Sequence, residues 1–224
     1  LSEAAAAMAP LLHADTVVLP LLNGVDISER LKALLPRGRV LSGCVYISAF
    51  IESPGVVRQV GGACQLFFGP DSGGVEAFRP LETLLKDAGI RAELTDRIGF
   101  HLWTKYLFVG PMAGVTSLMA KPFGAVMADQ EGRQMVRGLM EEILGLARAK
   151  GIALPPESVE EALEKVSRFP YGTKSSMQLD YEKGGRTEVD LFIGYAVRTG
   201  RSSGVPVPLH EELYAVLNRN PRRS

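Results

Sequence analysis

The sequence contains only two cysteines, Cys44 and Cys64, among its 224 residues. Two thiols without neighbouring metal ligands are too few for the disulfide scaffold of a small secreted protein or for a paired-cysteine zinc site. The three histidines are scattered along the chain without the spacing of metal ligands. We therefore expect buried free thiols, a reducing cytoplasmic environment and no metal centre.

No charge of either sign predominates, because 25 basic and 25 acidic side chains cancel. A polyanionic partner such as nucleic acid is therefore not expected. The longest uncharged apolar run, residues 106–120, is shorter than the roughly 20 residues that cross a bilayer, and it contains Pro111, so we expect no membrane helix. With 46% hydrophobic and 22% charged residues, the composition is typical of a globular protein with one large or two small domains.

The first hundred residues alternate between extended and helical patterns, as a parallel α/β layer does. Residues 16–19 predict a strand that ends at Asn23-Gly24, a dipeptide typical of turns, and a helix follows. Residues 40–50 predict another strand. Residues 56–60 and 65–68, separated by Gly61-Gly62, predict two short strands paired as a hairpin.

From about residue 99 onward almost every segment has the period of a helix. Interruptions are expected at Gly110-Pro111, Pro122, Pro155-Pro156 and Pro170. This change of pattern predicts two domains, residues 1–98 and 99–224. The predicted fold class is therefore α/β, with a sheet layer followed by an all-α helical domain.

The glycine-rich turn of dinucleotide-binding domains, G-x-G-x-x-G, does not occur in the sequence. A doubly wound sheet opens with a strand that leads directly into those glycines, whereas this chain opens with an alanine-rich helical segment. Nucleophile-elbow, P-loop and metalloprotease motifs do not occur either. Hydrolase and phosphotransferase functions therefore have no support from individual residues.

Lys105 follows Trp103-Thr104 and directly precedes the apolar run. Beside so much apolar surface its ammonium group would be partly desolvated, which lowers the pKa of a lysine and suits it to donate a proton to a developing alkoxide. The structural alternative is a lysine whose stem covers apolar residues while its ammonium group stays in water. The position in the sequence, taken alone, favours the structural alternative.

A second group of polar residues lies between residues 174 and 190. Ser176 and Asp180 are four residues apart and share a helix face, and Glu188 lies near the start of the next helix, where a negative charge is favoured. Ser175 and Glu188 can equally be capping and first-turn residues. Asn23 lies at the carboxyl end of a predicted strand, the edge at which open α/β sheets bind ligands, although Asn-Gly is also simply a good turn.

Taken together, these motifs resemble those of the ketopantoate reductase (2-dehydropantoate 2-reductase) family. Residues 19–25 resemble the family's strand and Asn-Gly turn, and Trp103-Thr104-Lys105 resembles its W-x-K motif. Three later segments also resemble family motifs, namely S-S-M-x-x-D at residues 175–180, R-T-E-V-D at 186–190 and G-V-x-x-P at 204–208. The resemblance extends in order over essentially the whole chain.

The resemblance implies a Rossmann-type, doubly wound NADP-binding domain that lacks its N-terminal part, followed by a helical substrate-binding domain. Lys105 would be the general acid that protonates the ketone of a 2-oxo acid while hydride arrives from NADPH. Glu188 would hold the substrate hydroxyl or the ammonium group of Lys105, close to the cofactor.

The same resemblance implies further binding residues. Ser176 would contact the substrate carboxylate, with Asp180 in the same motif. Asn23 would lie where nicotinamide and substrate meet, and Ala49 would lie near the point at which the family's backbone passes the nicotinamide. The implied activity is the NADPH-dependent reduction of 2-dehydropantoate or a similar 2-oxo acid, a step of pantothenate biosynthesis.

The sequence departs from the family at two points. Members that make pantoate carry asparagines one and two helical turns beyond the lysine, where this chain has Val109 and Ala113. The loss of these polar groups favours a less polar 2-oxo acid. The second departure is the absence of the phosphate-binding glycine turn. This absence leaves open a different class of function, in which a non-catalytic homologue or fragment serves for dimerisation or ligand binding. A homodimer is compatible with either function.

Overall fold

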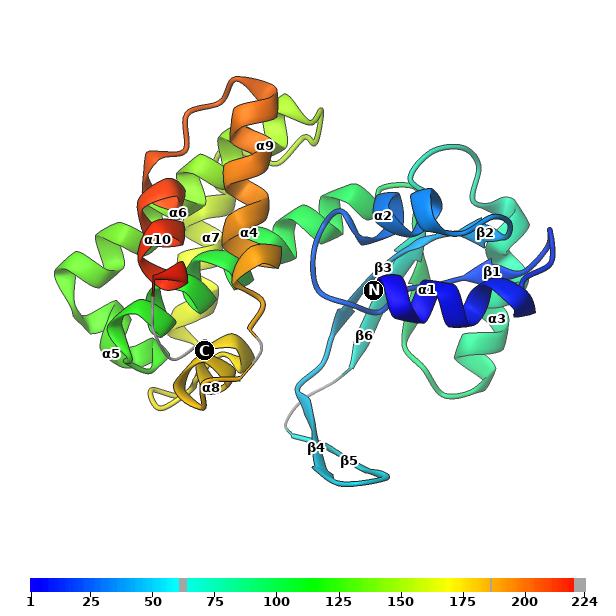
Figure 1. Cartoon of the computed structure of the whole chain (residues 1–224), viewed down its shortest axis with the longest axis horizontal. Helices are drawn as coiled ribbons and strands as arrows, with labels where there is room; N and C mark the ends of the chain where they lie inside the picture. The colour runs from blue at the N-terminus through cyan, green and yellow to red at the C-terminus, as the bar shows by residue number, and fades with distance from the viewer. Residues whose placement is uncertain (61–63, 186, 220–224) are drawn as a thin grey trace. The chain divides into compact units, whose positions relative to one another are not determined.

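The computed structural model describes residues 1–60, 64–185 and 187–219. The chain divides into two compact units, unit 1 from Leu1 to Leu102 and unit 2 from Trp103 to Ser224. Unit 1 holds the strands and unit 2 is helical, so the predicted fold class is confirmed (Figure 1). The division between the units lies within one long helix, α4 (Ile98–Met119). The expected glycine pair Gly61-Gly62 and the motif residue Arg186 lie outside the described residues.

Unit 1 begins with two helical segments and then alternates strands with short helices. Its elements are α1 (Ser2–Met8), η1 (Ala9–Leu11), β1 (Val17–Val18), α2 (Ile27–Leu34), β2 (Arg39–Val40), β3 (Ser42–Tyr46), β4 (Ala49–Ser53), β5 (Val56–Gln59), β6 (Gln65–Gly69), η2 (Glu76–Phe78), α3 (Arg79–Asp87) and β7 (Ala92–Leu94). β1 pairs in parallel with β2, β3 pairs antiparallel with β6, and β6 pairs in parallel with β7. β4 and β5 form a separate antiparallel pair.

The predicted hairpin of residues 56–60 and 65–68 is wrong. β5 pairs with β4, and β6 pairs with β3 and β7. The chain instead reverses at Pro54-Gly55, where Gly55 has φ 80°, a left-handed conformation that glycine adopts without strain. The arms on either side of this turn then pair with each other, first as β4 and β5 and further along as β3 and β6. The single strand predicted over residues 40–50 is accordingly divided among β2, β3 and β4.

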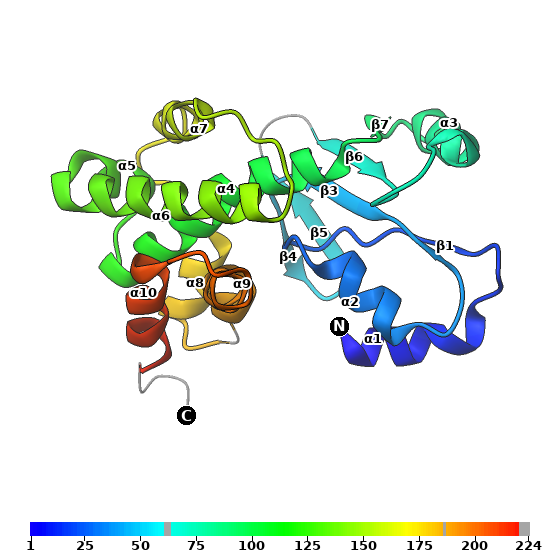
Figure 2. The same ribbon diagram turned by 90° about the horizontal axis from the view of Figure 1, so that it is seen from above.

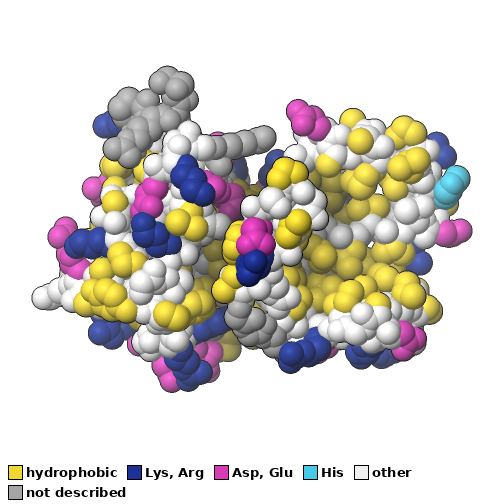
Figure 3. Space-filling view, turned by 90° about the horizontal axis from the view of Figure 1, so that it is seen from below, with side chains coloured by type: hydrophobic (Ala, Val, Ile, Leu, Met, Phe, Trp, Pro, Cys, Tyr) yellow, Lys and Arg dark blue, Asp and Glu magenta, His cyan; other side chains and the backbone are white. Residues whose placement is uncertain are grey.

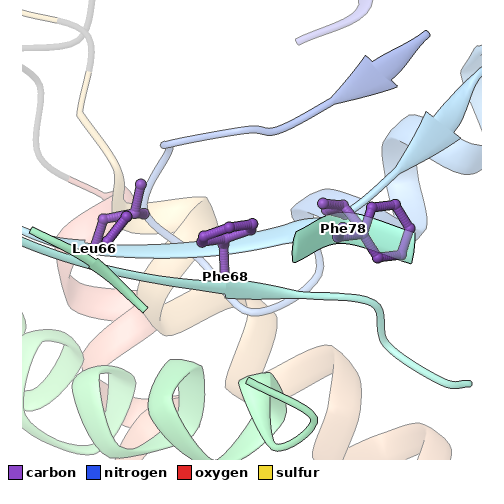
Figure 4. Close-up of a cluster of buried hydrophobic side chains, with 5 residues drawn as sticks. Leu66, Phe68 and Phe78 are labelled. Atoms are coloured by element: carbon purple, nitrogen blue, oxygen red, sulfur yellow. The ribbon is translucent and has the colours of Figure 1, made fainter. Parts of the chain in front are cut away.

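The core of unit 1 lies between its strands and α3. It consists of the buried residues Leu41, Leu66, Phe68, Phe78 and Ala92, and Figure 4 shows Leu66, Phe68 and Phe78 in one row. Phe68 is completely buried. Since full burial of a large apolar side chain contributes about 1.5–3 kcal/mol, this cluster stabilises the packing of β6 and β7 against η2 and the residue between β2 and β3.

Unit 2 contains the remaining helices. They are α4, α5 (Phe123–Ala128), α6 (Gln130–Ala149), α7 (Ser158–Ser167), α8 (Ser176–Glu182), the π-helical turn η3 (Asp190–Gly194), α9 (Tyr195–Ser203) and α10 (Pro208–Asn218). α6 contacts α5, α7, α9 and α10, and Figure 2 shows these helices from above, with α9 almost end-on. Leu139, Met140 and Ile143 on α6 are completely buried. The apolar face of α6 therefore forms the centre of this unit.

The interruption predicted at Pro111 is also wrong, because α4 continues through this residue. A proline inside a helix costs roughly 3 kcal/mol, since it removes a backbone hydrogen bond and crowds the preceding turn. Leu107, Met112 and Val115 on the adjacent turns are at most 1% exposed, and their burial outweighs that cost. Among the described residues, no helix combines the length and the apolar character needed to span a membrane.

Candidate active site

The loop after β1 lies against β3 in unit 1. The Leu41 N–H donates to the Val18 carbonyl at 2.9 Å, which continues the parallel pairing of β1 and β2. Gly43 is the second residue of β3, and a Cβ added to it would lie only 2.5 Å from the Pro20 carbonyl oxygen. The close approach of the loop to the strand therefore requires glycine at this position.

The loop then turns at Asn23-Gly24. Gly24 has φ 109°, and Asn23 is half-buried. The turn leads into α2, so Asn23 lies between the carboxyl end of a strand and the N-terminus of a helix, where open α/β sheets bind ligands. A small hollow lies here, with Pro20, Gly24, Val25, Ser28, Ser42 and Gly43 among its lining residues.

Three side chains donate hydrogen bonds to the carboxylate of Asp71 beside this hollow. Asp71 Oδ2 accepts from Ser28 Oγ at 2.9 Å and from Lys32 Nζ at 2.7 Å, and Oδ1 accepts from Ser42 Oγ at 2.5 Å. Burial raises the pKa of Asp71, but the hydrogen bonds from Lys32, Ser42 and Ser28 outweigh burial and hold the pKa below its ordinary value. The carboxylate is therefore ionised at neutral pH.

No motif in the sequence marks this cluster. Ser28 and Lys32 are four residues apart on α2, a spacing that places them on one helix face and that could have indicated a shared partner. Asp71 follows β6, and Ser42 is the first residue of β3. Their meeting depends on the antiparallel register in which Ser42 faces Gly69, and the incorrect hairpin prediction concealed that register.

Lys105 lies on α4 in unit 2 and is half-buried. Its neighbours Trp103 and Tyr106 are 5% and 3% exposed. Both rings pack against Tyr195 of α9, with centroid distances of 6.2 and 5.8 Å. The turn of α4 that carries Lys105 therefore packs against α9 through aromatic side chains.

The segment that carries Glu188 contacts α4 at the same turn. The Tyr106 hydroxyl donates to the Phe192 carbonyl at 2.5 Å, and the two rings stack with centroids 6.5 Å apart. The Phe192 N–H donates to the Glu188 carbonyl at 2.9 Å. Glu188 is half-buried and lies just before η3, and π-helical turns are frequent at functional sites. Unit 2 thus holds the segments of Lys105 and Glu188 together.

The start of α8 lies against α4 as well. Ser175 caps α8 with its side chain, and its Oγ lies 3.3 Å from Thr116 Oγ1 on α4, about three turns beyond Lys105. Ser176 is the first residue of α8 and is exposed, whereas Asp180 is half-buried. The capping role considered for Ser175 in the sequence is therefore the one that the structure has.

Ala49 lies apart from these groups. It is the exposed first residue of β4 and pairs with Gln59 of β5. It is not among the residues that line the hollow beside Gly24.

The residues around Asn23 fit one end of a nicotinamide cofactor. The Asn23 carboxamide can both donate and accept a hydrogen bond, which matches the carboxamide of a nicotinamide, and Gly24 allows a ligand to approach the backbone. The 224 residues contain no G-x-G-x-x-G turn for the pyrophosphate. The fit therefore concerns the nicotinamide end only.

Comparison with known proteins decides the family. A family profile described as "Ketopantoate reductase PanE/ApbA" matches residues 1–73, and one described as "Ketopantoate reductase PanE/ApbA C terminal" matches residues 99–220. The chain belongs to the ketopantoate reductase family. The predicted family is thereby confirmed, and the named relatives are oxidoreductases.

Individual relatives support the assignment. The uncharacterized oxidoreductase YkpB of Bacillus subtilis (strain 168) is 31% identical over 211 residues, which cover 93% of this chain and 69% of the relative. The structure of a PanE/ApbA family ketopantoate reductase from Ralstonia eutropha JMP134 matches with a TM-score of 0.86 at 30% identity, over 96% of this chain and 70% of that chain.

A third comparison gives another protein with the same fold. D-mandelate dehydrogenase, solved with NADH and anilino(oxo)acetate, shares the fold with a TM-score of 0.87 at 24% identity, over 97% of this chain and 71% of that chain. The chain spans 64% of the length of the 2-dehydropantoate 2-reductases of Streptococcus pyogenes. Because the chain spans only part of these enzymes, their activity can only be proposed for it.

Proposed function

We propose that the chain is part of an NADPH-dependent reductase that converts a 2-oxo acid to the 2-hydroxy acid. One observation carries the proposal, namely the contact between α4 and the Glu188 segment through Tyr106 and Phe192. This contact supports a shared site for Lys105 and Glu188. Family membership supports the reaction type, and the Asn23 turn supports a nicotinamide cofactor.

Lys105 is the general acid in this proposal. When bound, the cofactor supplies the hydride. The Lys105 ammonium group donates a proton to the ketone oxygen, so that one N–H bond breaks as the hydroxyl O–H bond forms, and the amine then regains a proton from solvent. The buried rings of Trp103 and Tyr106 exclude water, which strengthens the attraction between the ammonium group and the developing negative charge.

The other residues bind the substrate and the cofactor and orient the Lys105 ammonium group. Glu188 accepts a hydrogen bond from the Lys105 ammonium group or from the substrate hydroxyl and so holds the donor in place. Ser176 contacts the substrate carboxylate, with Asp180 on the next turn of α8. Asn23 contacts both substrate and nicotinamide, and Ala49 contributes backbone near the cofactor.

We assign an apolar 2-oxo acid as the preferred substrate. Val109 and Ala113 lie one and two turns beyond Lys105 on α4, where Val109 is half-buried and Ala113 is 1% exposed. Neither side chain can hydrogen-bond a substrate hydroxyl, so a hydroxyl placed there would lose its water without gaining a partner. D-mandelate dehydrogenase, solved with anilino(oxo)acetate, has this fold and holds an oxoacetate that carries an aromatic ring.

Replacement of Lys105 tests the proposal. In the full-length protein, Lys105→Ala is expected to lower kcat for 2-oxo acid reduction by more than tenfold, which corresponds to about 1.4 kcal/mol of barrier, because the ketone oxygen loses its proton donor. NADPH oxidation with a panel of 2-oxo acids measures this, and a parallel panel with NADH measures the cofactor preference.

Lys150→Ala provides the matched control, because Lys150 is exposed at the end of α6, and it should leave kcat unchanged. Turnover by Lys105→Ala within tenfold of the unaltered enzyme would exclude the general-acid role. If no 2-oxo acid supports NADPH oxidation by the full-length protein, the binding-module function becomes the better explanation.

A further inference from the structure

Asp71 connects three segments of unit 1 at the hollow beside Gly24. It accepts hydrogen bonds from Ser28 and Lys32 of α2 at 2.9 and 2.7 Å and from Ser42 of β3 at 2.5 Å. Ser28 and Ser42 line the hollow and are 6% and 2% exposed. Two buried hydroxyls at a candidate ligand site therefore depend on one carboxylate for their orientation.

The chemistry of these groups fixes what the hollow can bind. An ionised carboxylate only accepts hydrogen bonds, and a hydroxyl has one proton and two lone pairs. Because Asp71 takes the protons of both Ser28 and Ser42, the capacity that remains on each oxygen is that of an acceptor. A polar group that binds to these oxygens must therefore be a donor, such as an amide N–H.

We propose that Asp71 is a positioning residue that fixes Ser28 and Ser42 as hydrogen-bond acceptors, and that these two oxygens bind the carboxamide NH2 of a nicotinamide. The inference rests on the proposed function, which places the nicotinamide end of the cofactor at the adjoining turn of Asn23. Asp71 itself contacts neither cofactor nor substrate and acts only through the two serines.

The experiment compares two dinucleotides that differ at the carboxamide. In the 3-acetylpyridine analogue of NADP+ a methyl ketone replaces the carboxamide, so this group accepts a hydrogen bond but cannot donate one. Isothermal titration calorimetry on the full-length protein gives Kd for each dinucleotide without turnover. The unaltered protein is expected to bind NADP+ about tenfold more tightly than the analogue, as the loss of one or two hydrogen bonds implies.

Asp71→Asn is expected to reduce this preference to less than about threefold, because an amide partner also donates and frees the hydroxyls to rotate. Ser42→Ala and Ser28→Ala should each reduce it as well, since each removes one acceptor. Circular dichroism shows whether Asp71→Asn folds. If it does not fold, the two serine variants test whether their oxygens bind the carboxamide.

Two controls separate positioning from stability. Lys32→Met removes the ion pair with Asp71 but leaves both serine hydrogen bonds, so it should lower the melting temperature without changing the preference for NADP+. Glu76→Gln breaks another exposed ion pair, with Arg79, and Glu76 is not among the residues that line the hollow, so it should leave the preference for NADP+ unchanged.

Each outcome has a distinct meaning. If the unaltered protein binds both dinucleotides and the serine and Asp71 variants keep the same preference, the positioning role is wrong and the proposed function stands. If the unaltered protein binds neither dinucleotide, the proposed cofactor function is wrong, and the inference fails with it.

Discussion

At the scale of single residues, Val109 is the position at which the two candidate substrate types can be distinguished. It lies one turn beyond Lys105 and is half-buried, so an asparagine there can reach a substrate without being fully desolvated. Val109→Asn is expected to raise kcat/KM for 2-dehydropantoate relative to 3,3-dimethyl-2-oxobutanoate, which lacks only the hydroxyl, by about tenfold or more. Steady-state kinetics with the two acids measures the ratio.

Val109→Leu is the matched control, because it changes shape without adding a polar group and should not favour the hydroxylated acid. Ala113 is a poorer site for such a change, since at 1% exposure an asparagine would require space and hydrogen-bond partners that a packed helix does not provide. A ratio that stays constant in Val109→Asn would mean that this side chain does not face the substrate.

At the scale of helices and strands, Glu142 joins α6 to α10. Its carboxylate accepts the backbone N–H groups of Leu209 and His210 at 2.8 and 3.1 Å and contacts His210 Nδ1 at 2.6 Å. It therefore caps the N-terminus of α10 and pairs with a completely buried imidazole. One side chain on the central helix thus satisfies three polar groups of another element.

Glu142→Ala is expected to lower the free energy of unfolding by about 2–4 kcal/mol, because it leaves these donors without their acceptor. Urea denaturation followed by circular dichroism measures the loss. Glu141→Ala is the control, since Glu141 is the exposed neighbour on the same helix, and it should change stability by less than about 0.5 kcal/mol. Equal losses in the two variants would show that the cap contributes nothing specific.

The helices were easier to predict from the sequence than the strands. A helix depends on residues three and four apart, so the apolar stripe of α6 predicts its buried face directly. Strand pairing depends on residues distant in sequence, and the sequence pattern favoured a turn at Gly61-Gly62. The structure selects Pro54-Gly55, which lets β6 lie between β3 and β7 and contribute Leu66 and Phe68 to the core.

In the candidate site, too, contacts between residues distant in sequence were not predicted. Lys105, Ser176 and Glu188 were identified from motifs, and their proposed roles remain untested predictions. The Asp71 cluster has no motif, because its members come from α2, β3 and the segment after β6, and only the register of β3 and β6 brings them together. Local patterns therefore predict the helices and the motif residues, whereas contacts across the sheet require the structure.

At the scale of the whole molecule, each unit has its own apolar core, yet hydrophobic side chains also remain on the surface. Figure 3 shows many of them on the face of unit 1 that it presents. The β4–β5 pair is exposed along its entire length. Ile51 and Val57 are partners across this pair and are 75% and 71% exposed. An isolated two-stranded hairpin is marginally stable in water, and exposed apolar strands promote self-association.

Replacing this cross-strand pair by opposite charges should therefore reduce self-association without unfolding the protein. The double variant Ile51→Lys/Val57→Glu is expected to bind less of a hydrophobic dye and to sediment with less dependence on protein concentration. Its melting temperature should stay the same, because neither side chain packs against the core and opposite charges across a strand pair are mildly favourable.

Leu84→Lys is the control for the double variant. Leu84 is a single residue of α3 that is 65% exposed, and scattered exposed apolar residues of that kind are ordinary, so this change should not alter self-association. If the double variant unfolds at a markedly lower temperature, the hairpin must be packed against another surface in solution, and its exposure cannot be the source of self-association.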